Sequence, residues 1–94
     1  ENFRPGYLER IGLGPAELHA ANPGLIIARI SGYGQDGPYR DKPAFGAIGE
    51  AMGGLRHLTA NPGQTELPPP RCGVSISDDL AGMYGALAIV SACW

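Results

Sequence analysis

The sequence predicts an α/β fold, in which this chain supplies half of a doubly wound unit. Two observations lead to this prediction. The run Leu25–Ile30 is apolar and rich in β-branched residues, and it follows a helical segment that ends at Asn22-Pro23-Gly24. The run Leu80–Trp94 is apolar, has helical spacing and carries no charge, so we expect a helix that is buried on nearly all sides.

The chain has 94 residues, of which 44% are hydrophobic and 17% are charged. The charged content is low for a free-standing domain. The first residues are typical of the end of a strand, and the last ones lie inside an apolar helix without a stop signal. We therefore expect an interior fragment of a larger protein, with no domain boundary between residues 1 and 94.

Charge and composition argue against several classes of partner. The net charge is −2 and there is no basic tract, so we expect no nucleic acid. The apolar run is shorter than the ~20 residues that cross a bilayer, and no targeting signal is present, which favours a cytoplasmic protein without a membrane partner. Cys72 and Cys93 form no metal pattern, and we expect buried free thiols and no metal site.

The remaining elements are short helices and loops. We expect them, in chain order, at these positions: a helical turn over 7–11 closed by Gly12, a helix over 14–21, a three-glycine loop over 31–39, a helix over 43–55 with many small residues, and a loop over 59–70 that ends in Pro68-Pro69-Pro70. We expect no catalytic role for three further residues: His19 should be exposed on its helix, Glu50 should lie on the opposite side of its helix from Ile48, and His57 has no acid or nucleophile nearby in the sequence.

Asp78 lies where the irregular segment 71–77 meets the long apolar helix. Asp78 and Asp79 fall in the first helical turn, where the partial positive charge of the helix favours an ionised carboxylate. With few competing waters, such a carboxylate can attack an activated acyl group. Ser77, Asp78 and Asp79 also suit a helix cap, and this stretch taken alone favours the cap.

Arg4 and Arg10 flank the first helical turn and are able to converge on one anion, because the planar arginine fork makes paired hydrogen bonds to phosphate. The ends of strands in open α/β sheets are also common ligand sites. From the residues alone, two solvated surface arginines remain the preferred interpretation.

Several stretches, however, match a known pattern in order and spacing. They are ENFRPG at 1–6, ERIGL at 9–13, ISGYGQDGPY at 30–39, and GVSISD at 73–78 with AGM at 81–83. Together they resemble the CaiB/BaiF family, the class III CoA-transferases, whose relatives include formyl-CoA transferase and the α-methylacyl-CoA racemases. The resemblance covers nearly all of the chain.

The resemblance implies a large Rossmann-like domain and a small domain in chains of several hundred residues, two of which interlock as a homodimer. This chain would be an interior piece of the large domain. The implied reaction moves coenzyme A from an acyl-CoA to a carboxylic acid. Acyl-CoA and carboxylate are then substrates, and no cofactor is permanently bound.

The resemblance also implies roles for single residues. The family's nucleophilic aspartate matches Asp78 and not Asp79, because Asp78 has the right offset from Ala81-Gly82-Met83. Asp78 would form a mixed anhydride and then an aspartyl-CoA thioester. The family's CoA-contacting positions fall on the following residues, the third being a further candidate: Asn2, Phe3, Arg4, Arg10 and Ile11.

One departure concerns the racemase branch, which has a His-Asp pair where this chain has Phe45 and Gly46. A racemase needs an acid/base group on each face of the α-carbon, and phenylalanine cannot serve. This favours the transferase and leaves Phe45 as a candidate for the acyl pocket. The alternatives are an acyl-CoA racemase relative, and a truncated non-catalytic remnant that acts only in binding.

Overall fold

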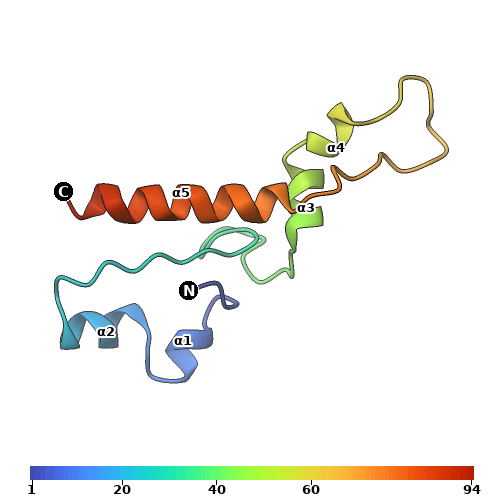
Figure 1. The fold of residues 1–94 in the computed structure, drawn as a ribbon. Coiled ribbons are helices and arrows are strands. Elements are labelled where there is room, and N and C mark those ends of the chain that lie inside the picture. The colour runs from blue at the N-terminus through green and yellow to red at the C-terminus, as the bar shows by residue number, and fades with distance from the viewer.

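The computed structural model describes residues 1–94 and contains five α-helices and no β-strand (Figure 1). The helices are α1 (Tyr7–Arg10), α2 (Pro15–Ala21), α3 (Gly46–Met52), α4 (Leu55–Leu58) and α5 (Ile76–Ala92). The predicted helical segments at 7–11 and 14–21 are confirmed, and Pro15 occupies the start of α2 as expected for its fixed backbone angle.

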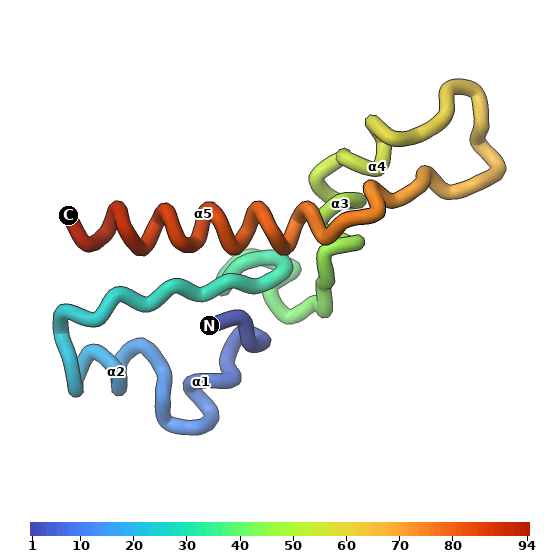
Figure 2. Tube along the Cα trace, viewed as in Figure 1, coloured from blue at the N-terminus to red at the C-terminus, as the bar shows by residue number.

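The chain is open and elongated, as the Cα trace in Figure 2 shows. Its radius of gyration is 16.9 Å, against about 12 Å for a compact chain of this length. Its accessible surface is 7139 Å², against about 5,200 Å² for a compact monomer of this mass. No hydrophobic residue is fully buried, so these residues do not form a hydrophobic core by themselves.

The predicted buried strand at Leu25–Ile30 is not formed in this chain. The segment is extended, but Leu25 and Ile26 are 36% and 39% exposed. The Glu1 amino group donates to the Ala28 carbonyl (2.8 Å), and the Ile30 N–H donates to the Glu1 carbonyl (2.9 Å). This is the slanted pattern of a single parallel bridge. A buried parallel strand needs neighbouring strands and helices on both faces, and the chain supplies only this one contact.

The long apolar helix is confirmed as α5, but the prediction that it is buried on nearly all sides is wrong. Met83, Tyr84 and Trp94 are 69%, 68% and 104% exposed. The extended run 25–30 lies along one side of α5 (Figure 1), and a Cβ atom at Gly85 would lie 2.8 Å from Cδ1 of Ile30. Apart from α3, which packs against its first turn, no other helix of this chain covers α5.

The predicted helix over 43–55 is shorter, spanning only α3, and a separate turn of helix, α4, follows it. Gly54 adopts φ 81° between the two helices, a left-handed conformation that glycine reaches without steric cost. Helix α3 contacts both α4 and the start of α5. This three-helix junction, at the opposite end of α5 from the C-terminus in Figure 1, contains the candidate site.

Candidate active site at the start of helix α5

Asp78 is the third residue of α5, and its carboxylate lies against the first residue of α3, Gly46. A Cβ atom at Gly46 would stand 2.5 Å from Oδ2 and 3.1 Å from Cγ of Asp78. One turn along α3, a Cβ atom at Gly49 would stand 2.9 Å from Oγ of Ser77. The two glycines therefore allow the first turn of α5 to approach the backbone of α3 directly.

The start of α5 is well suited to a negative charge. Ser75 occupies the N-cap position but makes no side-chain hydrogen bond to the helix. The first N–H groups of the helix therefore keep their capacity to donate, and the helix dipole adds a partial positive charge there. The capping interpretation of this stretch has no side-chain hydrogen bond to support it.

Asp78 and Asp79 are separated by direction. Successive residues of a helix point about 100° apart, and all three atoms nearest to the open side of Gly46 belong to Asp78. Both aspartates are exposed in this chain, and the Asp79 backbone N–H donates to the Ser75 carbonyl at 2.9 Å. Only Asp78 is therefore directed at α3.

Phe45, the residue predicted for the acyl pocket, is brought close to Asp78. It is the N-cap residue of α3 and directly precedes Gly46. Its side chain is 83% exposed and fills no pocket within this chain. The structure thus brings Phe45 and Asp78 to one junction and leaves the phenyl ring free.

The residues predicted to contact CoA form a second, separate group around α1. The rings of Phe3 and Tyr7 lie 4.7 Å apart, and the Arg10 guanidinium lies 5.6 Å above the Tyr7 ring. Asn2, Arg4 and Ile11 are exposed beside them. The aromatic stack fixes Arg10 on the surface of α1, where its donors remain available to an anion.

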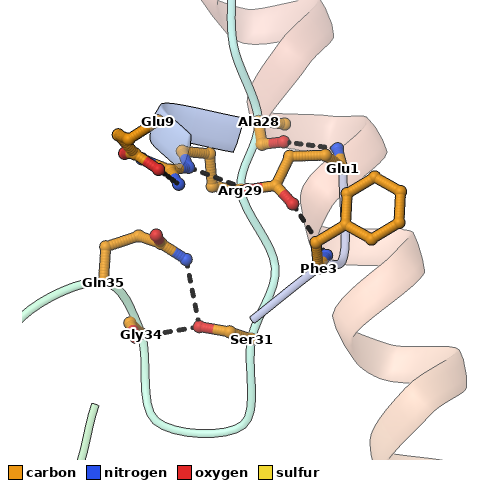
Figure 3. A network of polar contacts seen from close by, with 8 residues as sticks. All are labelled: Glu1, Phe3, Glu9, Ala28, Arg29, Ser31, Gly34 and Gln35. Carbon is orange, nitrogen blue, oxygen red and sulfur yellow. Dashed lines mark hydrogen bonds and ion pairs between the residues drawn. The ribbon is translucent and has the colours of Figure 1, made fainter. Parts of the chain in front are cut away.

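An ion-pair network centred on Arg29 supports this N-terminal group (Figure 3). The Arg29 guanidinium donates to Glu1 at 2.8 Å and to both oxygens of Glu9, at 2.7 and 3.2 Å. The hydrogen bond from Arg29 lowers the pKa of the Glu9 carboxyl, and the two acids raise the pKa of Arg29. Burial raises the pKa of the Glu1 carboxyl, but the Arg29 and Phe3 N–H hydrogen bonds outweigh it, so that pKa is also lowered.

A polar hollow of about 280 Å³ adjoins this network. Its lining consists of Pro5, Gly6, Glu9, Arg29, Gln35, Arg40 and Asp41. Gln35 of the glycine loop is part of this lining. Within the loop, Ser31 Oγ donates to the Gly34 carbonyl at 2.8 Å and receives a hydrogen bond from Gln35 at 3.1 Å (Figure 3). The loop predicted between residues 31 and 39 is thus confirmed.

Two charged residues, Arg29 and Glu50, form ion pairs in the structure that the sequence analysis did not predict. Arg29 interrupts an otherwise apolar run, and a charge in such a run needs an acidic partner, which was the available signal. Glu50 is the only buried charged residue, at 1% exposure. Its signal was weaker: it follows Gly46 by four residues and therefore shares its face of α3.

No group of three or more histidine, cysteine or acidic side chains has a geometry that would hold a metal ion. The two cysteines are free, but the prediction that both are buried is wrong, since Cys72 is half-buried and Cys93 is exposed. None of the five helices has the length and hydropathy that a membrane span requires.

The junction of α3 and α5 thus holds the Asp78 carboxylate at a helix start, against the backbone of Gly46. Comparison with known proteins gives the family. Residues 1–94 match the profile of CoA-transferase family III, and the chain belongs to that family.

Two similar proteins come from Chloroflexus aurantiacus. The chain is 60% identical to its succinyl-CoA–D-citramalate CoA-transferase over 92 residues, covering 98% of this chain and 22% of the relative. It is 45% identical, with the same coverage, to the beta subunit of its succinyl-CoA–L-malate CoA-transferase. The chain therefore spans about a fifth of the length of these relatives.

The fold of the chain is also similar to that of a solved structure. A CaiB/BaiF family protein from Brucella suis superposes with a TM-score of 0.86 at 35% identity, over 99% of this chain and 24% of that protein. The open arrangement of helices described above is accordingly similar to a segment of a larger fold.

Proposed function

We propose that this chain carries the nucleophile of an enzyme that transfers coenzyme A from an acyl-CoA to a carboxylic acid, and that the nucleophile is Asp78. The observation that carries the proposal is the placement of Asp78 at an uncapped helix start against Gly46, in a chain of CoA-transferase family III. Because no side-chain cap occupies the first N–H groups of α5, these groups remain available beside the Asp78 carboxylate.

In the first half of the proposed reaction, one Asp78 oxygen attacks the thioester carbon of the donor. The C–S bond breaks, the thiolate of CoA leaves with the electron pair, and a mixed anhydride forms between donor acyl group and Asp78. The thiolate then attacks the Asp78 carbonyl carbon. The donor leaves as a carboxylate, and Asp78 becomes an aspartyl-CoA thioester.

The second half runs these steps in reverse with the acceptor. An acceptor carboxylate attacks the aspartyl thioester, releases the thiolate and forms a second anhydride. The thiolate attacks the acceptor side of that anhydride, which yields the new acyl-CoA and restores the Asp78 carboxylate. No proton is gained or lost overall, which fits a site without a histidine beside Asp78. The first turn of α5 would stabilise the oxyanions that form at each step.

We propose succinyl-CoA as donor and a hydroxy-dicarboxylic acid as acceptor. The support is the identity of 60% and 45% to transferases named for succinyl-CoA with D-citramalate and with L-malate. Phe45, directly before Gly46, would line the acyl side, and the residues around α1 would hold the CoA: Asn2, Phe3, Arg4, Arg10 and Ile11. The phosphates of CoA suit the fork of Arg10.

In the full-length protein, we propose that this chain is an interior part of a Rossmann-like large domain in an interlocked homodimer in the cytoplasm. The parallel bridge between Glu1 and the run 25–30 supports a neighbouring strand. The exposed apolar faces of α5 support coverage by other parts of the dimer. Sedimentation of the full-length protein as a monomer would contradict the dimer.

The test of the proposed function uses the full-length protein with succinyl-CoA as donor and D-citramalate or L-malate as acceptor. Incubation with succinyl-CoA alone, followed by hydroxylamine and peptide mass spectrometry, should place a hydroxamate on Asp78. New acyl-CoA should appear only when an acceptor is present. Exchange of the α-hydrogen of an acyl-CoA without transfer would instead indicate racemase chemistry, and modification of another residue would contradict the role of Asp78.

A further inference from the structure

The segment that leads into α5 is held by side chains from α3 and α4. Arg56 donates to the Pro69 carbonyl, and Thr59 Oγ1 donates to the Pro70 carbonyl at 2.9 Å. Arg71, the next residue, donates to Glu50 Oε1 at 3.2 Å. Three consecutive residues are therefore fixed to the neighbouring helices before α5 begins.

Glu50 differs from the other two contacts because it carries a buried charge. Its side chain has no exposed surface, whereas that of Arg71 is 51% exposed. Its second oxygen, Oε2, is buried without a hydrogen-bond partner. A buried carboxylate is costly unless it is paired, and an ordinary interior position would favour an apolar residue of the same size. The carboxylate is better explained by a task at this place than by stability.

The position of Glu50 on α3 indicates that task. Glu50 follows Gly46 by four residues, and such residues share one face of a helix, about 5–6 Å apart. Gly46 contacts Asp78, and Gly49 contacts Ser77. One short face of α3 therefore contacts Arg71 at its end and the first turn of α5 at its start.

We propose that Glu50 is a positioning residue for Asp78: its ion pair with Arg71 fixes the entry into α5, and so holds the Asp78 carboxylate in line with its substrate. This inference deepens the proposed function and rests on it. The pair acts through the backbone of residues 71–77 and makes no contact with substrate. The positive charge of Arg71 also balances the negative charge of Glu50, which lies on the same face of α3 as Gly46, the residue that contacts Asp78.

The pair should respond asymmetrically to substitution. Removing Arg71 leaves the buried Glu50 carboxylate without its partner. Removing the charge of Glu50 leaves only Arg71 unpaired, and that side chain is half exposed to water. Arg71→Met should therefore lower the melting temperature more than Glu50→Gln does. The double variant should recover part of that loss, because no buried charge is left unpaired. Arg71→Lys keeps the charge and should remain close to wild type.

The test of positioning uses the full-length protein and two readouts. A misplaced reacting group costs up to about a hundredfold in rate, so kcat with succinyl-CoA should fall about tenfold or more in Glu50→Gln while KM stays within about twofold. Amide hydrogen exchange over residues 74–79 should become faster in the same variant. Glu66→Gln, the same change at an exposed carboxylate, should leave both readouts unchanged.

Several results would overturn the proposal. They are an unchanged kcat in folded Glu50→Gln, a loss confined to KM, an equal loss in Glu66→Gln, or unchanged exchange at the start of α5. If Glu50→Gln does not fold, the same two readouts are taken on Arg71→Lys and on the double variant Glu50→Gln with Arg71→Met. Full kcat in that double variant would overturn the proposal. A wild-type protein without transferase activity would overturn the proposed function, while the exchange result would still report on the pair by itself.

Discussion

The Asp78 carboxylate packs directly against Gly46, so close that a Cβ atom at position 46 would lie 2.5 Å from Asp78 Oδ2. The two residues are 32 positions apart and belong to different helices. The missing side chain at Gly46 is therefore part of the architecture around the proposed nucleophile, and it explains why the start of α3 contains so little bulk.

Gly46→Ala in the full-length protein tests this relationship. The new methyl carbon would lie 2.5 Å from Asp78 Oδ2, so the carboxylate must move. A displacement of this size should lower kcat about tenfold to a hundredfold, in steady-state assays with succinyl-CoA. Gly24→Ala, the same change in an exposed turn, should leave kcat unchanged. Normal turnover in Gly46→Ala would show that the contact does not matter for the reaction.

The two adjacent aspartates should differ sharply on substitution. Asp78→Asn removes the attacking oxygen charge, so hydroxylamine trapping and transfer should both be lost. Asp79→Asn removes only a favourable charge near a helix start, worth about 0.3–1 kcal/mol of unfolding free energy, and should keep most of the activity. Chemical denaturation measures the change in unfolding free energy, and hydroxylamine trapping measures formation of the covalent intermediate. Transferase activity in Asp78→Asn would end the assignment.

Arg10 should contribute to CoA affinity and not to the chemical step. Arg10→Ala removes a charge-assisted contact of about 1.5–3 kcal/mol, so KM for acyl-CoA should rise about tenfold or more with kcat little changed. Arg10→Lys keeps the charge without the planar fork and should give an intermediate KM. A collapse of kcat at constant KM would contradict this role.

The Arg29 network should contribute to stability in a pH-dependent way. The pKa values of Glu1 and Glu9 are lowered in the folded chain from an ordinary value of 4.5. The stabilisation is therefore fully present above pH 4.5 and is lost as the pH falls through the lower folded values. Arg29→Gln should lower the melting temperature of the full-length protein more at pH 7 than at pH 3.

The matched control for this pH dependence is Arg40→Gln. Arg40 pairs with Asp41 at 3.4 Å on the open surface, with both side chains more than half exposed. Such pairs are weak because water screens them, so Arg40→Gln should change the melting temperature little at either pH. An equal change in melting temperature for both substitutions would show that the network around Arg29 stabilises the protein no more than an exposed surface ion pair does.

The 94 residues expressed alone should associate and lack a cooperative melting transition. Large apolar side chains along α5 are exposed, including Met83 at 69% and Leu87 at 60%, and contiguous apolar patches drive association. Met83→Lys with Leu87→Lys should reduce the association. Sedimentation and calorimetry provide the measurement, and a monodisperse, cooperatively melting monomer would contradict the prediction.

Local elements were predictable because their causes are local. Pro15 at a helix start and the run of residues 59–70 with its prolines act on their own backbone and their near neighbours. The sequence therefore predicted α1, α2, α5 and both loops. The same holds for Asp78 in the first turn of a helix, which follows from the order of residues 71–80.

Burial was not predictable, because it depends on what lies across the molecule. The apolar runs at 25–30 and 80–94 indicate surfaces that need cover, and that inference identified a piece of a larger fold. Within this chain, however, Ile26 and Tyr84 remain exposed. The predictions of a buried strand and a buried helix failed because neither run finds its neighbours here.

The sequence by itself determined the family pattern, the helices α1, α2 and α5, and the place of Asp78 in the first turn of α5, because each rests on order and spacing along the chain. Only the tertiary structure decided that Gly46 opens space for Asp78, that Arg29 joins Glu1 to Glu9, and that Glu50 pairs with Arg71. These pairs are 20 to 32 residues apart, by simple difference of residue numbers. Contacts at such separations are fixed by the packing of helices and extended segments, and no local propensity specifies them.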